Sequence, residues 1–273
     1  MRGILGAMPP AATLAEALAP LRADPSQSAV LLDIDGTLAP IVRHADDAHV
    51  PESTRTALIA VARMYAVVAC VSGRQASVGR RIVSLGQIAY IGGHGSELLL
   101  PGGGGVEIDR EVAAYTERVK RFIAQLDQSV LHHERIRVED KQAIAALHWR
   151  GAPDEASAEE IVRGIAHDAE AAGFAIHWGK KILEIRPPVE ISKGRGIKRL
   201  LRDRDLTAAV YVGDDRTDLD AFAGLRDLVE HGRLGTAVCV GVTSDETPPE
   251  LREQADVLID GPPGVRELLE ALT

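Results

Sequence analysis

Short runs of apolar residues alternate with amphipathic segments along most of the chain. The apolar runs cover residues 29–32, 66–71, 88–91, 208–212, 237–240 and 256–259, and the segments between them predict helices over 11–22, 53–64, 75–85, 192–204 and 217–226, with a last helix closing the chain. Strands that are apolar on both faces are typical of parallel sheets covered by helices on both sides. The pattern therefore predicts an α/β fold with a doubly wound parallel sheet.

The segment from 108 to 187 follows a different pattern. It predicts a helix near 109–127, strands at 135–139 and 143–149, a second helix near 153–172, and strands at 174–178 and 182–186. The short connections between these strands indicate antiparallel pairs. We therefore expect a small α+β domain, in the order αββαββ, inserted into a core formed by residues 1–107 and 188–273. The glycine run 102–105 that precedes it is expected to form a mobile hairpin tip, with a hinge as the alternative.

Composition excludes several classes of partner. The net charge of −9 and the pI near 5.5 argue against nucleic acid or an anionic membrane. Cys70 and Cys239 lie in apolar runs and are expected to be buried structural thiols in a reducing compartment. The first ten residues make a poor signal peptide, and no apolar run approaches the length of a membrane span. These features predict a cytoplasmic protein, and we expect a monomer or a weak dimer.

Polar side chains follow the predicted strands at the points where the strands end. Asp33 and Asp35 follow the first strand, and Ser72, with Gly73 and Arg74, follows the second. Further along the chain, Lys193 opens a helix, and Asp214, Asp215 and Asp218 follow another strand. Ligands of open α/β sheets bind at the carboxyl ends of the strands, so these groups are expected to meet. Neighbouring carboxylates call for a divalent cation. The chain has no Walker phosphate loop and no Gly-x-Ser-x-Gly elbow.

In this order the motifs resemble those of the haloacid dehalogenase superfamily of phosphotransferases. The matching residues are Asp33-Ile34-Asp35-Gly36-Thr37, Ser72, Lys193 and Gly213-Asp214-Asp215. The resemblance implies that Asp33 is a nucleophile that forms an aspartyl phosphate and that Asp35 is a general acid and then a base. It also implies Mg²⁺ bound by Asp33, the backbone carbonyl of Asp35 and Asp214, with Ser72 and Lys193 on the phosphoryl oxygens. Asp215 and Asp218 would support this site.

The inserted segment resembles the cap of the trehalose-6-phosphate phosphatases. The similar stretches are Gly92-Gly93-His94-Gly95-Ser96-Glu97, Val138-Glu139-Asp140-Lys141, Leu147-His148-Trp149-Arg150 and Leu183-Glu184-Ile185-Arg186-Pro187. The resemblance implies hydrolysis of trehalose 6-phosphate, with a cap that closes over the sugar. The residues expected to bind substrate are Gly36, Thr37, Gly73, Arg74, His94, Glu97, Lys141, His148, Arg150, Glu184 and Arg186. Strict alternation would place Lys141 and His148 on opposite faces unless the turn between their strands resets the phase.

Other functions stay open at this point. The core motifs do not encode the sugar, so the substrate could be sucrose phosphate or the phosphate of glucosyl-glycerate or mannosyl-glycerate. A phosphomutase would need a second phosphate-binding cluster, and none is obvious in the sequence. A receiver-type signalling domain also gathers Asp, Ser or Thr, and Lys around Mg²⁺, but it is much shorter and has no inserted cap.

Overall fold

The structure is a computed structural model that describes residues 13–42, 47–141 and 143–273. Its contacts divide the chain into two units, Met1–Glu107 with Ile191–Thr273, and Ile108–Glu190. The second core segment therefore begins at Ile191, where the sequence pattern predicts residue 188. No helix in the described ranges combines the length and the apolar character that a membrane crossing requires.

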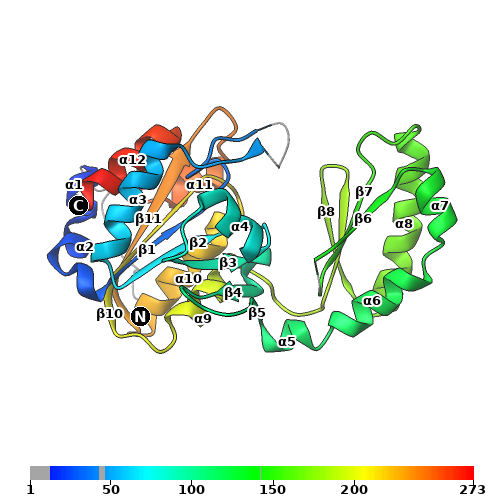
Figure 1. Cartoon of the computed structure of the whole chain (residues 1–273), viewed down its shortest axis with the longest axis horizontal. Helices are drawn as coiled ribbons and strands as arrows, with labels where there is room; N and C mark the ends of the chain where they lie inside the picture. The colour runs from blue at the N-terminus through cyan, green and yellow to red at the C-terminus, as the bar shows by residue number, and fades with distance from the viewer. Residues whose placement is uncertain (1–12, 43–46, 142) are drawn as a thin grey trace, which may run out of the picture. The chain divides into compact units, whose positions relative to one another are not determined.

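The first unit is built on an eight-stranded sheet in the order β12-β11-β10-β1-β2-β3-β4-β5 (Figure 1). The strands are β1 (Ser28–Leu32), β2 (Val67–Val71), β3 (Ala89–Gly92), β4 (Glu97–Leu99), β5 (Glu107–Ile108), β10 (Leu206–Gly213), β11 (Leu234–Thr243) and β12 (Val257–Asp260). All neighbouring pairs from β12 to β3 are parallel, and β4 runs antiparallel to β3. The predicted parallel sheet is thus confirmed.

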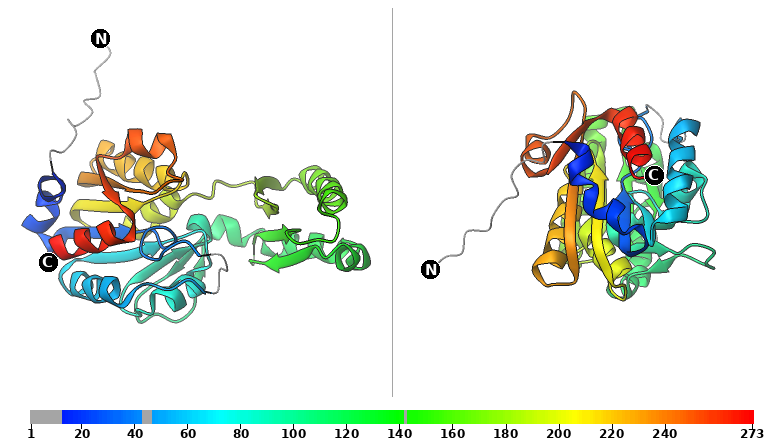
Figure 2. Two further views of the ribbon diagram at one scale, coloured as in Figure 1. Left: turned by 90° about the horizontal axis from the view of Figure 1, so that it is seen from above. Right: turned by 90° about the vertical axis from the view of Figure 1, so that its left-hand side faces the viewer.

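Helices cover this sheet on both faces (Figures 1 and 2). They are α1 (Leu14–Ala17), α2 (Ala19–Ala23), α3 (Glu52–Met64), α4 (Ala76–Val83), α9 (Lys193–Leu201), α10 (Asp218–Glu230), α11 (Pro249–Gln254) and α12 (Gly261–Ala271), with short 3-10 turns at Pro25–Gln27 and Gly93–Gly95. Alternate residues of β1 point to opposite sides: Val30 packs in a core with α3, α4 and α12, and Leu31 in a core with α9, α10 and α11. The sheet is therefore doubly wound, as the apolar runs predict.

The helix predicted over 11–22 and the glycine run 102–105 can be compared with the structure in detail. Residues 11 and 12 of the helix predicted over 11–22 lie outside the described residues, and the rest of it forms two short helices, α1 and α2, which meet at Leu18 just before Pro20. The glycine run 102–105 lies between β4 and β5, which are hydrogen-bonded neighbours in the sheet. It therefore forms the tip of a hairpin. Cys70 and Cys239 are buried free thiols, as expected.

The second unit is a four-stranded antiparallel sheet with helices on one side (Figure 1). The strands β6 (Arg137–Asp140), β7 (Ala145–His148), β8 (Ala175–Gly179) and β9 (Ile182–Arg186) are arranged in the order β6-β7-β9-β8, and the helices are α5 (Arg110–Ala113), α6 (Thr116–Gln125), α7 (Gln128–His133) and α8 (Glu155–Ala171). One apolar core joins this sheet to α6, α7 and α8. This unit is the expected small α+β cap.

The single helix predicted over 109–127 is wrong. The chain forms α5 and α6 there and then adds α7, which the sequence pattern did not predict. Asp109 and Asp127 each accept hydrogen bonds from the backbone amides of the following first turn, so each starts a helix of its own. The apolar positions of α6 and α7 continue one stripe because both helices pack on the same core.

Candidate active site

Three strands deliver the first set of polar groups to one edge of the core sheet. β10, β1 and β2 are neighbours in register, so that Leu32 lies opposite both Val212 and Cys70. Asp33 and Ser72 come directly after β1 and β2, and Asp214 directly after β10. Asp33 and Ser72 are 5% and 4% exposed, which places both in a protected position. The predicted convergence at the carboxyl ends of the strands is therefore present in the fold.

Lys193 reaches this edge from the start of α9. Ser192 caps the helix by accepting a hydrogen bond from the backbone amide of Arg195. The helix crosses α10 at two glycines, and a Cβ atom on Gly224 would lie only 2.6 Å from the Cα atom of Gly194. This close approach brings Lys193 to the beginning of α10. Its Nζ atom donates to Oδ1 of Asp33 at 2.7 Å and to Oδ1 of Asp218 at 2.6 Å.

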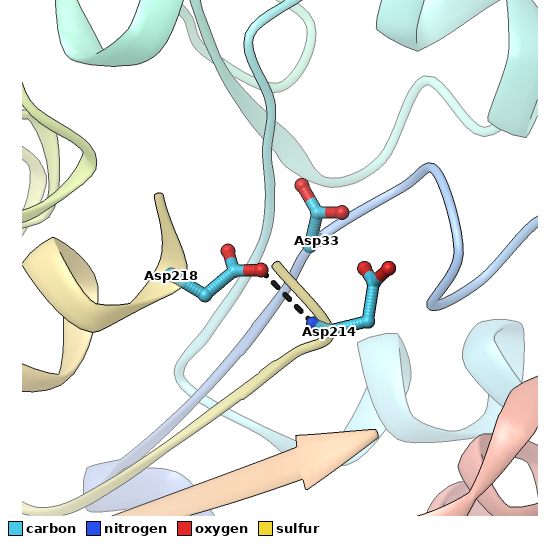
Figure 3. A group of neighbouring side chains, drawn as sticks. All are labelled: Asp33, Asp214 and Asp218. Atoms are coloured by element: carbon cyan, nitrogen blue, oxygen red, sulfur yellow. Dashed lines mark hydrogen bonds between the residues drawn. The ribbon is translucent and has the colours of Figure 1, made fainter. Parts of the chain in front are cut away.

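Asp218 is completely buried and fully engaged by hydrogen-bond donors. Its Oδ1 atom accepts from Lys193 and from the hydroxyl of Tyr211, both at 2.6 Å. Its Oδ2 atom accepts from the backbone amide of Asp214 at 2.9 Å (Figure 3). The same atom also accepts from the backbone amide of Asp215 at 2.9 Å. Asp218 therefore orders Lys193 and the loop after β10.

The carboxylates of Asp33, Asp214 and Asp218 form a cluster that fits a divalent cation. One oxygen from each lies within 4.8 Å of the others. Lys193, Tyr211 and two backbone amides already donate to the oxygens of Asp218, so Asp33 and Asp214 are the members of the cluster whose carboxylates could hold a cation (Figure 3). Oxygen ligands of this kind suit Mg²⁺.

The loop after Asp33 is shaped around Asp214. Thr37 is buried and donates its hydroxyl to Oδ1 of Asp214 at 3.0 Å. Gly36 has a φ of +82°, and a Cβ atom there would lie 2.1 Å from Oδ2 of Asp214. A larger residue would clash with this carboxylate. Gly36 and Thr37 thus position Asp214.

The charges in this cluster perturb one another. Burial raises the pKa of Asp33 well above its ordinary value, and the charges of Asp218 and Asp214 act in the same direction, against Lys193. Burial alone would lower the pKa of Lys193, but the carboxylates of Asp218 and Asp33 outweigh it and raise this pKa, so the amine stays protonated. Burial, followed by the charge of Asp218, raises the pKa of Asp214 to about 6. One lysine facing three carboxylates leaves the cluster short of positive charge, which a cation would supply.

The raised pKa of Asp214 predicts a pH-dependent stability for the metal-free protein. Because this pKa, about 6, exceeds the ordinary value of 3.8, folding favours the protonated carboxyl. That contribution to stability is present at low pH and is lost as the pH rises through about 6. Urea unfolding in EDTA measures this effect. Between about pH 4 and about pH 7, the unfolding free energy of the wild type should fall by on the order of 1–3 kcal/mol relative to that of Asp214→Asn.

Added Mg²⁺ should offset this loss at neutral pH in the wild type and have a much smaller effect on Asp214→Asn, since binding requires the ionised carboxylate. A difference between the two proteins that stays constant with pH would contradict the electrostatic description of Asp214.

Asp35 is held by an arginine from the next strand end. Arg74 donates from Nε and from a terminal guanidinium nitrogen to the two carboxylate oxygens of Asp35, each at 2.7 Å. This two-point contact fixes the orientation of the carboxylate. Ser72 accepts a hydrogen bond from the backbone amide of Arg74 at 3.1 Å, so it also shapes this loop. The sequence predicted Arg74 as a substrate residue and did not predict its pairing with Asp35.

His94 and Glu97 lie in the same unit with different surroundings. The ring of His94 lies against Gly73, where an added Cβ atom would be 2.6 Å from the ring. Glu97 is 4% exposed, and its Oε2 atom accepts from the backbone amide of Ala76 at the start of α4, at 2.7 Å. Its carboxylate caps this helix, so we assign it to the support of the loop rather than to a sugar hydroxyl.

One face of the cap sheet carries charged residues, and the opposite face packs on the helices. Lys141 donates to Oε1 of Glu184 at 3.0 Å, and Arg186 donates to Oε2 from Nε at 2.9 Å. His148 pairs with Glu139 at 2.8 Å. We call these five residues the polar face of the cap. Glu139 was not among the predicted site residues, although it lies in the stretch Val138-Glu139-Asp140-Lys141 that carries the resemblance.

The β6–β7 turn resolves the question of phase. The backbone amide of Lys141 bonds to the carbonyl of Ile144, and Arg137 lies opposite His148. Residues opposite each other share a face, so Arg137 and His148 do. Arg137 and Lys141 also share a face, because they are an even number of residues apart. Lys141 and His148 therefore lie on the same face. Arg150 lies beyond β7 and donates to the backbone carbonyl of Lys180 at 3.3 Å.

The pKa of Glu184, the carboxylate between Lys141 and Arg186, depends on burial and on the charges of these two neighbours. Burial would raise the pKa of Glu184, but the charges of Arg186 and Lys141 outweigh it and lower this pKa to about 2. Glu184 is only 6% exposed and is therefore an ionised acceptor held between two cations.

Comparisons with known proteins agree with this arrangement. A family model described as trehalose-phosphatase matches residues 31–253. Trehalose 6-phosphate phosphatase RA3 of Zea mays is 29% identical over 90% of this chain and 70% of its own length. A Mycobacterium tuberculosis protein described as an uncharacterized glycosyl hydrolase is 32% identical over 72% of this chain, and the match spans 15% of that longer protein.

Comparison with solved structures also finds trehalose-6-phosphate phosphatases. The C-terminal domain of a Candida albicans trehalose-6-phosphate phosphatase superposes with a TM-score of 0.69 over 98% of both chains, at 21% identity. The family match includes the Asp33–Lys193 cluster and the whole polar face of the cap. The chain therefore belongs to the trehalose-phosphatase family of the haloacid dehalogenase superfamily.

Proposed function

We propose that this protein hydrolyses trehalose 6-phosphate to trehalose and inorganic phosphate. The observation that carries the proposal is the family match over residues 31–253, because that segment holds both the carboxylate–lysine cluster and the polar face of the cap. The cluster supports transfer of a phosphoryl group, and the polar face offers acceptors and donors for sugar hydroxyls.

In the first step Asp33 attacks the phosphorus of the substrate. A bond forms between a carboxylate oxygen of Asp33 and phosphorus, and the bond between phosphorus and the sugar oxygen breaks. Asp35 gives a proton to the leaving sugar oxygen, which departs as a hydroxyl. In the second step Asp35 takes a proton from a water molecule whose oxygen forms a bond to the same phosphorus. The bond between phosphorus and the Asp33 oxygen breaks, which releases phosphate and restores the Asp33 carboxylate.

The remaining groups of the cluster stabilise charge. Lys193, bonded to Asp33 at 2.7 Å, lets the anionic nucleophile approach an anionic phosphate. The hydroxyl of Ser72 is proposed to donate to a phosphoryl oxygen. The proposed ligands of Mg²⁺ are the carboxylates of Asp33 and Asp214 and the backbone carbonyl of Asp35. When bound, the ion neutralises negative charge on the phosphoryl oxygens.

Arg74 is proposed to orient Asp35 in its ionised form, which is the form that takes a proton from water in the second step. Its two hydrogen bonds orient the carboxylate, and the guanidinium also carries positive charge close to the reacting phosphate. Gly73 allows the close contact with His94, which we propose as a further neighbour of the substrate.

The polar face of the cap is proposed to recognise the sugar. Glu184 accepts and Lys141 and Arg186 donate, in positions fixed by their mutual ion pairs. A disaccharide presents many hydroxyls, each of which is both a donor and an acceptor. Arg150 is left out of this set because of its contact with Lys180.

Replacing Glu184 by Gln should weaken selection of the sugar. The neutral amide cannot hold both cations as a carboxylate does, so we expect kcat/KM for trehalose 6-phosphate to fall about 10- to 100-fold. Hydrolysis of p-nitrophenyl phosphate, which has no sugar, should change by less than about threefold. Steady-state phosphate release with both substrates measures the two effects.

The matched control for this variant is Glu155→Gln, which removes the cap ion pair with Lys181 outside the polar face. It should leave the hydrolysis of trehalose 6-phosphate and of p-nitrophenyl phosphate unchanged. An equal loss on both substrates in Glu184→Gln would contradict the role of this residue in sugar recognition.

The substrate assignment is tested by a panel of phosphate esters. Mg²⁺-dependent phosphate release is measured for trehalose 6-phosphate, sucrose 6-phosphate, glucose 6-phosphate and the phosphates of glucosyl-glycerate and mannosyl-glycerate. We expect kcat/KM for trehalose 6-phosphate to exceed the others by about 100-fold or more. A clear preference for another member of the panel would reject trehalose 6-phosphate and keep the phosphatase.

A further inference from the structure

Tyr211 is a buried hydroxyl that none of the proposed steps uses. It lies in β10, is 0% exposed, and packs edge-to-face on Phe222 of α10 with ring centroids 6.0 Å apart. Its hydroxyl donates to Oδ1 of Asp218 at 2.6 Å. A tyrosine with this burial has its ring fixed by packing, so the position of its hydroxyl is fixed as well.

The hydroxyl of Tyr211 contacts Asp218, which connects several parts of the candidate active site. Asp218 joins three parts of it: Lys193 through Oδ1, and the amides of Asp214 and Asp215 through Oδ2. Among the four donors that the described residues provide to this carboxylate, Tyr211 is the one whose donating group is a side chain of the central sheet. The other three belong to the helix and the loop that Asp218 orders. The hydroxyl of Tyr211 therefore anchors Asp218 to the sheet.

We propose that Tyr211 is a positioning residue for the phosphatase reaction, acting through Asp218 on Lys193 and on the loop of Asp214. The inference rests on the function proposed for Asp33 and adds a residue that neither the motifs nor the comparisons identify. Asp218 binds the Lys193 amine and the Tyr211 hydroxyl on one oxygen, which leaves Lys193 shared between Asp218 and Asp33.

Loss of the hydroxyl would disturb this sharing. The buried Oδ1 atom of Asp218 would keep Lys193 as its remaining donor, in a position where water cannot replace the lost one. Asp218 would then attract Lys193 more strongly, or turn toward it, and Asp33 would lose part of its partner. The nucleophile and the phosphoryl oxygens would be less well shielded in the transition state, which lowers kcat.

The test compares Tyr211→Phe with Tyr90→Phe. Tyr90 is 1% exposed, lies in β3 of the same sheet, and donates its hydroxyl to the backbone carbonyl of Leu85. The two substitutions remove the same atom from equally buried sites, so we expect similar decreases in Tm. For Tyr211→Phe we expect kcat to fall about tenfold or more with KM changed less than about twofold, and for Tyr90→Phe we expect kcat within about twofold of wild type.

A double-mutant cycle with Asp218→Asn shows whether Tyr211 acts through Asp218. Single-turnover rates are measured for the wild type, both single variants and the double variant. In the Asp218→Asn background, the Phe substitution should change the rate by less than about twofold. An undiminished effect in that background would overturn the proposed route, and so would a kcat for Tyr211→Phe equal to that of Tyr90→Phe.

Failure of this inference can be separated from failure of the proposed function. If the wild type releases no phosphate from any phosphate ester of the panel, the proposed function is rejected and the inference with it. If the wild type turns over and the two Phe variants behave alike, only the role of Tyr211 is rejected. The Tm of each variant shows whether it is folded, and Asp218→Asn tests the same contact from its other side without changing the tyrosine.

Discussion

An Asp33→Asn variant is expected to lose about ten-thousand-fold or more in kcat while keeping its fold. The amide is nearly the same size as the carboxylate, but it is not a nucleophile toward phosphorus. Because Asp33 is buried and its charge is partly unfavourable there, the neutral Asn should also leave the stability of the metal-free protein unchanged or higher. Phosphate release at saturating substrate measures the first effect, and thermal unfolding measures the second.

The matched control for Asp33→Asn is Asp203→Asn, an identical substitution at an exposed position between α9 and β10. It should leave kcat unchanged. An Asp33→Ala variant guards against slow deamidation of the new Asn, which would restore the carboxylate. Residual activity within about 100-fold of wild type in both Asp33 variants would reject Asp33 as the nucleophile.

Replacement of Lys193 by Met is expected to damage both stability and turnover. Lys193 is 3% exposed and bridges Asp33 and Asp218, so its loss leaves two buried carboxylates without the cation that pairs with both. We expect a loss of about 3–5 kcal/mol in unfolding free energy at neutral pH, and a fall in kcat of about 1,000-fold or more. Urea unfolding and phosphate release measure these effects.

The electrostatic cause makes two further features of Lys193→Met checkable. Lys193 lowers the pKa of Asp33 against the effect of burial, so without Lys193 this pKa should rise further in the folded state. The destabilisation should therefore lessen as the pH falls and the Asp33 carboxyl takes up a proton. The double variant Lys193→Met/Asp33→Asn should recover part of the lost stability without recovering activity. Lys198→Met, on the same helix, removes the exposed pair with Asp227 and should cost less than about 1 kcal/mol. A destabilisation independent of pH, or as small as that of Lys198→Met, would contradict the account of Lys193.

The architecture was predictable because burial on two faces leaves a strong sequence signal. The runs at 29–32 and 208–212 are apolar throughout, and they are β1 and β10, adjacent and parallel in the sheet. The cap strand 182–186 was predicted with its bounds, since its alternating residues divide between a core and a polar face. Such signals are local. The break between α5 and α6 was missed because an apolar stripe continues across it, and only the packing of the cap decides where each helix starts.

The candidate site was predictable as far as it depends on residues at strand ends. Asp33, Ser72 and Asp214 lie at one edge because the sheet is parallel and ordered β10-β1-β2, and Lys193 joins them from the start of α9. The partners within the site were not predictable. The pairing of Arg74 with Asp35, the use of Glu97 as a cap for α4, and the bond from Tyr211 to Asp218 depend on side-chain orientations set by tertiary packing. Tyr211 in particular lies inside an apolar run and gives no signal of a polar role.

The faces of the cap sheet show the same limit. Alternation along each strand was correct, but the relation between β6 and β7 depends on the turn at residues 141–144, where Lys141 pairs with Ile144. That pairing places Lys141 beside Glu184 and on the face of His148. A turn with one residue more or fewer would reverse this result, and no local propensity decides between them.

The most direct test of the central claim is to find the phosphoryl group on Asp33. An Asp35→Asn variant, which should slow hydrolysis of the intermediate, is mixed with trehalose 6-phosphate and Mg²⁺, quenched with acid, and digested for mass spectrometry. The account predicts that the peptide containing Asp33 gains the mass of one phosphoryl group, that borohydride reduces this residue, and that neither change occurs with Asp33→Asn. A phosphoryl group on another residue, or release of phosphate with no enzyme-bound phosphoryl group at any time, would contradict it.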